Sequence, residues 1–208
     1  MLIEKKNIKP FYYKKKNFFD KYKELILEKN ELYGLTTVKD DEFEEKHFYD
    51  SLSVLPLILR KDYKNLKIAD VGSGAGFPSI PLLLVETDLN IDLIESNHKK
   101  AKFLTEVIDK FSINSAKVIC SNVREIREKY DIVIFRAFSS LQDFFKVAKS
   151  LLKEGTSIYA LKGKINEIEK EIFIVKKQNL WKYINVFEIH QVTGFQWERN
   201  IVEIIWGK

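Results

Sequence analysis

The sequence has only one cysteine, Cys120, and three histidines, His47, His98 and His190, among 208 residues. A single cysteine excludes an internal disulfide and is typical of a protein in a reducing cytoplasm. The scattered histidines do not have the spacing of metal ligands, so we expect no metal site. No run of 18 or more apolar residues occurs, and the first residues lack the apolar core of a signal peptide. We therefore expect no membrane span and a cytoplasmic protein.

Internal repeats and low-complexity linkers are also lacking. A chain of 208 residues, 45% of them hydrophobic, is long enough for one domain with an extension. We divide it into a basic helical N-terminal extension, residues 1–65, and a core, residues 66–208. Residues 1–23 contain eight lysines and two acidic residues, and the net charge is +2 over 1–65, −1 over 66–145 and +4 over 146–208. Positive flanks suit a polyanionic substrate, and they equally fit ordinary solvated lysines.

Hydrophobic periodicity predicts an alternation of strands and helices. An apolar stripe over 11–29 indicates a helix, and a second helix is expected to start at Asp40 or Asp41 and to end near Leu55, before Pro56. The expected strands are 67–71, 91–95, 116–120, 130–135, 156–161, 183–189 and 200–206. The expected helices are 78–86, 97–111, 123–128, 140–152 and 164–178. This alternation favours an α/β fold with a Rossmann-like parallel sheet, whose last two strands place one antiparallel strand at an edge.

The glycine-rich segment 68–78 is the most informative motif. Its glycines, Gly72, Gly74 and Gly76, have the spacing G-x-G-x-G, and Phe77 stands where a dinucleotide motif needs glycine. Asp70 precedes the loop, and an acid there suits a ligand with a cationic amine. The pattern favours S-adenosylmethionine, but a nicotinamide dinucleotide or a tight turn without a ligand remain alternatives.

Ligands of such sheets bind outside the carboxyl ends of the strands, so the residues after each strand are the candidate contacts. Glu95 ends the second strand, 19 residues after Gly76, where an acid can bind a ribose diol. Arg136 ends the fourth strand and is expected to face the crevice. The complete set of candidate cofactor contacts is Asp70, Gly72, Ser73, Gly74, Gly76, Phe77, Glu95, Asn122, Val123, Arg124 and Arg136, with residues 122–124 covering an adenine ring.

The residues at the strand ends limit which kinds of methyl acceptor the site suits. Phe135-Arg136-Ala137-Phe138 lacks the Asn or Asp and the prolines that are typical of methylation at an exocyclic amine. Cys120 follows the third strand, away from the place of a nucleophilic cysteine, and we expect it to be a small buried apolar residue. No acid–base pair stands out. An acceptor that is already nucleophilic remains, such as guanine N7, for which positioning and electrostatics carry the rate.

Several motifs together resemble one family, the bacterial small-subunit rRNA guanine-N7 methyltransferases called RsmG or GidB. The matching segments lie within residues 30–205 and are, in order, Tyr33-Gly34-Leu35-Thr36-Thr37, Lys46-His47-Phe48-Tyr49-Asp50-Ser51-Leu52, the glycine loop with Ile80-Pro81-Leu82, Arg136-Ala137-Phe138-Ser139-Ser140-Leu141, Ala160-Leu161-Lys162-Gly163 and Glu198-Arg199. The resemblance implies a class I S-adenosylmethionine-dependent methyltransferase. It further implies methylation of N7 of the guanine at position 527, in the 530 loop of 16S rRNA, with rRNA or the small subunit as the partner. We expect the protein to be a monomer.

The resemblance also implies roles for individual residues. Cofactor contacts carry over to Gly72, Phe77, Val123, Arg124 (by its backbone only) and Arg136, with Glu95 on the ribose. Arg136 is the expected catalytic residue, by positioning, and no general base is expected. His47, Lys162 and Arg199 are candidates for guiding RNA, although each can also be an ordinary structural or surface residue. Other acceptors stay open, namely another RNA or a small molecule, as do a nicotinamide-dependent oxidoreductase and a silent RNA-binding module.

Overall fold

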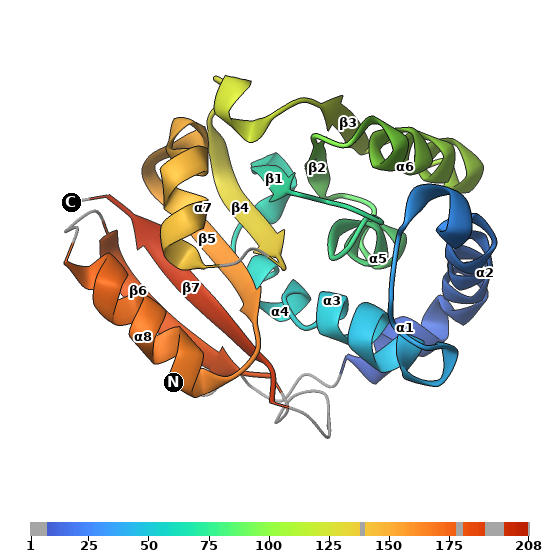
Figure 1. Ribbon diagram of the computed structural model, residues 1–208, viewed down its shortest axis with the longest axis horizontal. Coiled ribbons are helices and arrows are strands. Elements are labelled where there is room, and N and C mark those ends of the chain that lie inside the picture. The colour runs from blue at the N-terminus through green and yellow to red at the C-terminus, as the bar shows by residue number, and fades with distance from the viewer. Residues whose placement is uncertain (1–7, 138–139, 178–180, 190–197, 208) are drawn as a thin grey trace.

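The computed structural model describes residues 8–137, 140–177, 181–189 and 198–207. The described residues form a seven-stranded sheet with helices on both faces (Figure 1). The strands are β1 Lys67–Val71, β2 Asn90–Glu95, β3 Ala116–Cys120, β4 Tyr130–Arg136, β5 Leu152–Lys162, β6 Trp181–Glu188 and β7 Asn200–Trp206. The longer helices are α1 Lys9–Lys14, α2 Lys16–Tyr33, α5 Ser79–Val85, α6 His98–Phe111, α7 Leu141–Ala148 and α8 Ile165–Lys176.

Short helical turns connect these elements. They are η1 Asp40–Glu42, η2 Glu44–Tyr49, α3 Asp50–Leu52, α4 Leu55–Ile58, η3 Tyr63–Asn65, η4 Val123–Glu125 and η5 Lys149–Leu151. The turn η2 is a π-helix, in which the backbone N–H groups reach one residue further back than in an α-helix. It leads directly into α3, so Lys46, His47 and Asp50 project from one irregular helical segment.

The strand order is β3-β2-β1-β4-β5-β7-β6. Strands β1 to β5 are parallel, and β7 runs antiparallel to both β5 and β6. This order confirms the predicted α/β class and the Rossmann-like sheet. The antiparallel strand is not at an edge, however: β7 lies between β5 and β6, because the chain passes outward to β6 and returns to fill the gap.

Alternation along the strands separates two hydrophobic layers. Ile68 of β1 and Ile132 of β4 join one buried cluster, whereas their neighbours Ala69 and Val133 join the other. The first cluster includes α2, α5 and α6, and the second includes α7 and α8. Figure 1 shows α1 and α2 next to α5 and α6, with α7 and α8 at the other end of the molecule. The parallel sheet is therefore covered on both faces.

The N-terminal helices share a core with the sheet. Phe19, Tyr22 and Ile26 of α2 are fully buried in the same cluster as Ile80 of α5 and Leu104 of α6. The division between residues 65 and 66 stays a prediction. The shared cluster means that the two parts pack on each other through buried side chains.

Three local expectations were wrong. The residues 123–128 form only the single turn η4, because Asn122 caps that turn and the chain then extends towards β4. The helix expected from Asp40 or Asp41 is a series of short turns, and neither aspartate provides a cap. Pro56 does not end it either: it stands in the first turn of α4, where a proline loses no hydrogen bond.

Candidate functional site

The glycine loop connects β1 to α5, and its backbone needs glycine. Gly72, Gly74 and Gly76 have φ angles of 75°, 57° and 92°, in the left-handed region that disfavours other residues. The Gly72 and Ser73 N–H groups donate to the Ile94 carbonyl at 2.8 and 3.2 Å, which fixes the start of the loop against β2. A Cβ at Gly76 would lie 2.5 Å from the Tyr22 hydroxyl and from Ile80 Cγ1, so packing also requires glycine there.

Two acids stand beside this loop. Asp70 is fully buried at the end of β1, and neither carboxylate oxygen has a hydrogen-bond partner within the described residues. Burial raises the pKa of Asp70 to about 7, although Ser79 and Arg136 favour the charged form. Glu95, at the end of β2, is 8% exposed and accepts from Gly74 N at 2.9 Å and from Asn97 N at 2.7 Å. Each Glu95 oxygen keeps a second lone pair for a ligand hydroxyl.

The third strand ends in the turn η4. The Asn122 side chain accepts from Arg124 N at 3.0 Å, which orders the turn, while the Asn122 and Arg124 side chains are exposed and Val123 is half-buried. Cys120 is exposed, with Sγ 3.2 Å from Nδ1 of His98. The expectation of a buried Cys120 was wrong, because β3 is an edge strand of the sheet and its last side chain is exposed.

The chemistry of the glycine loop, Asp70 and Glu95 fits S-adenosylmethionine as a bound ligand. A cationic ligand at the loop would favour the charged form of the buried Asp70 carboxylate, whereas a phosphate would oppose it, so this residue favours a cationic ligand. Glu95 offers acceptors for ribose hydroxyls, and the backbone of Gly72 to Phe77 offers a close approach. No cluster of histidine, cysteine and acidic residues suited to a metal ion occurs within the described ranges.

Arg136 is held at the carboxyl end of β4 by the irregular segment 44–50. Its Nη1 donates to the Lys46 carbonyl at 3.1 Å and to Asp50 Oδ2 at 3.2 Å, and its Nη2 lies 3.2 Å from His47 Nδ1. The guanidinium also lies over the ring of Phe77, 4.9 Å from its centroid. Burial lowers the pKa of Arg136, and Asp50 opposes this. The Arg136 side chain is thus fixed between the glycine loop and the irregular segment 44–50.

His47 is a buried neutral residue. Since Arg136 only donates, Nδ1 of His47 must accept, and the proton therefore lies on Nε2, which is 2.7 Å from the Thr36 hydroxyl. Burial and the charge of Arg136 lower the pKa of His47 to about 3. Its ring stacks on Phe77 at 4.3 Å with an interplanar angle of 4°. Both ring nitrogens are therefore occupied within the fold.

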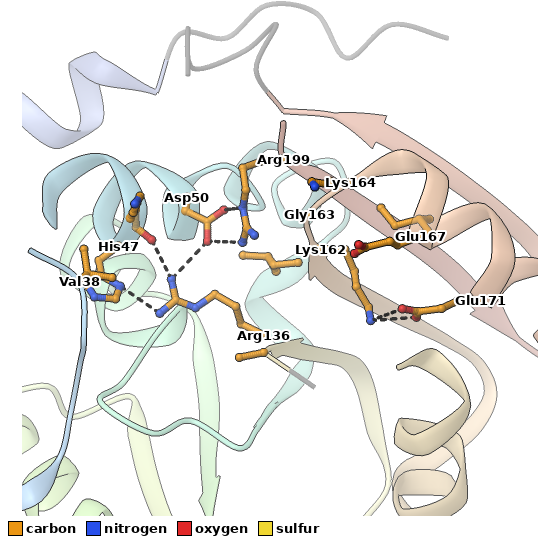
Figure 2. A pocket seen from close by; sticks show the side chains of 14 residues that line it. Val38, His47, Asp50, Arg136, Lys162, Gly163, Lys164, Glu167, Glu171 and Arg199 are labelled. Atoms are coloured by element: carbon orange, nitrogen blue, oxygen red, sulfur yellow. Dashed lines mark hydrogen bonds and ion pairs between the residues drawn. The ribbon is translucent and has the colours of Figure 1, made fainter. Parts of the chain in front are cut away.

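Arg199 and Arg136 share one carboxylate. Arg199 Nε donates to Asp50 Oδ1 at 2.9 Å and Nη2 donates to Oδ2 at 2.8 Å, a two-point contact. Figure 2 shows Asp50 between the two guanidinium groups. Asp50 is 1% exposed, and the sequence-based reasoning gave it no role. The signal was present, because Asp50 lies within the segment Lys46 to Leu52 that carries the family resemblance.

A cavity of about 480 Å³ opens next to these residues. Its lining joins residues 38–50 to the carboxyl ends of β4 and β5, to Arg199 just before β7 and to the first half of α8 (Figure 2). Lys162 lines it and forms an ion pair with Glu171 at 2.8 Å, and Glu171 also accepts from Leu141 N at 2.7 Å. The structure therefore brings His47, Arg136, Lys162 and Arg199 to one cavity. Phe138 and Ser139, from the Arg136 motif, lie outside the described residues.

The comparisons with known proteins decide the family. The family model GidB, described as rRNA small subunit methyltransferase G, matches residues 15–202. The chain belongs to the GidB family. A relative from Brachyspira hyodysenteriae, named ribosomal RNA small subunit methyltransferase G, is 37% identical over 191 residues, 91% of this chain and 90% of the relative. One of the same name from Mycoplasma capricolum is 35% identical over 192 residues, 89% of this chain and 81% of the relative.

Solved structures identify the fold of this GidB member as that of class I S-adenosylmethionine-dependent methyltransferases. An S-adenosylmethionine-dependent O-methyltransferase from Thermotoga maritima has a TM-score of 0.59 at 15% identity, covering 76% of this chain and 65% of that one. P. horikoshii TYW2, solved in complex with MeSAdo, has a TM-score of 0.53 at 16% identity, covering 70% and 58%. No described helix is long and apolar enough to cross a membrane.

Proposed function

We propose that this GidB member transfers a methyl group from S-adenosylmethionine to N7 of a guanine in 16S rRNA, at position 527 in the 530 loop. The observation that carries the proposal is the matched family, and the geometry of the candidate site supports it: the glycine loop, Glu95 and a half-buried Arg136 over Phe77. The name of the family and of its relatives supports ribosomal RNA of the small subunit as the substrate.

We propose that the cofactor is held by the backbone from Gly72 to Phe77, by Glu95 at the ribose and by Asn122 to Arg124 at the adenine. When bound, S-adenosylmethionine supplies an electrophilic methyl group. A positively charged ligand at the loop would favour the ionised form of Asp70, whose pKa is raised to about 7 by burial, and the carboxylate would in turn stabilise the ligand. Arg136 acts by position: three acceptors and the Phe77 ring hold its guanidinium at the carboxyl edge of the sheet.

The electrostatics of the cavity suit an acceptor that needs no deprotonation. His47 cannot act as a base, since its ring nitrogens are occupied and its pKa is lowered to about 3. The Asp50 carboxylate is neutralised by two arginines. Guanine N7 carries a lone pair in the neutral base, so positioning alone can bring about its methylation.

The test is methyl transfer from labelled S-adenosylmethionine to small ribosomal subunits and to naked 16S rRNA, both from a strain that lacks this protein. We expect label at N7 of one guanine in the 530 loop, located by mapping the modified base. Label at a different RNA position would correct the target. Bound cofactor without label on any RNA would overturn the RNA assignment and favour a small-molecule acceptor.

A further inference from the structure

The Asp50 carboxylate is the point where three distant parts of the chain meet. Asp50 belongs to the irregular segment 44–50, Arg136 lies at the end of β4 and Arg199 precedes β7. Arg199 makes the shorter and more numerous contacts, at 2.8 and 2.9 Å, compared with 3.2 Å for Arg136. Arg136 keeps two other acceptors, Lys46 O and His47 Nδ1. Loss of Asp50 would therefore release mainly Arg199.

We propose that Asp50 is a positioning residue, which holds the Arg199 guanidinium at the cavity wall so that its outer N–H groups bind a backbone phosphate of the RNA. The inference rests on the proposed function and assigns one part of that site. A guanidinium has five N–H groups, and Arg199 uses two of them, on Nε and Nη2, to bind Asp50. Three N–H groups remain, two on Nη1 and one on Nη2, and the edge formed by one N–H of each nitrogen has the planar fork geometry that suits a phosphate.

The charge balance of the cavity supports an anionic ligand. Its lining has five positive side chains and three negative ones, Asp50, Glu167 and Glu171, a net charge of +2. Asp50 compensates one of its two arginines, and the side chains of Arg136 and Arg199 are 16% and 23% exposed. Lys164 lines the same cavity, and its side chain is exposed at the start of α8 (Figure 2). Partial burial strengthens the attraction between these charges and a phosphate.

The other two RNA candidates are less suited to this task. His47 has no ring nitrogen to offer, because Thr36 and Arg136 occupy both. Lys162 is 10% exposed and bound to Glu171, which also holds the start of α7. Among the three candidates, only Arg199 has a guanidinium plane that is fixed by two contacts to Asp50 and N–H groups that the described residues leave available.

A double-mutant cycle tests the proposal on the full chain. The variants are Asp50→Asn, Arg199→Met and the double variant, and the readouts are KM and kcat for the rRNA substrate, cofactor affinity by calorimetry and Tm. Each single variant should raise KM by about tenfold, the loss of one charge-assisted contact. Asp50→Asn should have no further effect on KM when Arg199 is already Met, because it acts through that arginine.

Asp92→Asn is the matched control. Asp92 is another buried carboxylate, 6% exposed, which accepts from the Tyr130 hydroxyl at 2.8 Å and pairs with Lys67, away from the cavity lining. It should lower Tm without changing KM. If Asp50→Asn does not fold, Arg199→Lys replaces it: a lysine keeps the charge but loses the two-point contact, so KM should rise almost as much as for Met.

The outcomes separate the two proposals. Additive effects of Asp50→Asn and Arg199→Met on KM, or a KM for Asp50→Asn equal to that of Asp92→Asn, would overturn the role of Asp50. If Asp50→Asn does not fold, a wild-type KM for Arg199→Lys would do so. A wild type that binds rRNA but transfers no methyl group would overturn the proposed function instead. In that case the same cycle is read from the Kd for rRNA, measured without cofactor.

Discussion

Gly72 is the single residue at which the proposed cofactor site is tested most directly. Its φ of 75° lies in the left-handed region and its N–H group donates to the Ile94 carbonyl, so a side chain added here would bring bulk and charge to the turn of the glycine loop. Aspartate tolerates the left-handed region better than most residues, so Gly72→Asp should fold. We expect this variant to lose cofactor binding, measured by calorimetry, with Tm as the check on folding. Wild-type affinity in a folded variant would mean that the loop is not the site.

His47 gives a prediction on pH. Its pKa is about 3 in the folded protein and about 6.5 in the unfolded chain, so the unfolded state binds more protons between these values. The contribution of His47 to stability is therefore full above pH 6.5 and decreases as the pH falls, by at most about 1.4 kcal/mol per pH unit. Asp70 contributes in the opposite direction, because its pKa is raised to about 7.

The comparison of wild type with His47→Gln isolates the histidine, since Asp70 is common to both. The difference in unfolding free energy, from urea melts at pH 4.5 to 8, should rise with pH up to about 6.5 and then stay level. A difference that is constant across this range would mean that His47 has the same pKa in the folded and unfolded states.

The packing of α2 and α5 against the glycine loop gives a prediction at the scale of elements. Gly76 and Gly155 both have positive φ, but a Cβ at Gly155 meets nothing within 4 Å, whereas one at Gly76 meets Tyr22 and Ile80 at 2.5 Å. Gly155→Ala should cost only the backbone strain, about 1 kcal/mol. Gly76→Ala should cost about 1–3 kcal/mol more because of overpacking. Thermal melts measure both, and equal losses would refute the packing argument.

The elements also show what the sequence could predict. The parallel strands were predicted well, since buried runs such as Ile132 to Phe135 end in polar residues. The position of β7 was not, because a one-dimensional pattern does not say which gap a returning strand fills. The π-helix η2 was not predicted for a related reason. Its Lys46 carbonyl accepts a hydrogen bond from Arg136, which lies 90 residues away in the sequence, so a local pattern does not reveal it. Asp50 looked ordinary, since burial and ion pairing arise only when distant segments meet.

The whole molecule should unfold as one unit. Phe19 and Tyr22 of α2 are buried in the same cluster as Ile68 of β1 and Ile132 of β4, and the Tyr22 hydroxyl donates to the Ala75 carbonyl in the loop. Hydrogen exchange at increasing urea should therefore show α2 and β1 opening with the same free energy. Earlier opening of α2 would mean that residues 1–65 are a separate unit, as the boundary at residue 65 suggests.

The strand order has a consequence for synthesis. Strand β6 emerges from the ribosome before β7, yet within the described residues β7 is its ladder partner. Asp50 likewise precedes Arg199 by 149 positions. A nascent chain therefore carries an unpaired edge and a carboxylate without its main partner until translation has passed residue 206, and such long-range pairing is slow to form. The cavity at Asp50 is completed last, so, if it is the site of methylation as proposed, partly synthesised chains should not methylate the ribosomal subunits around them.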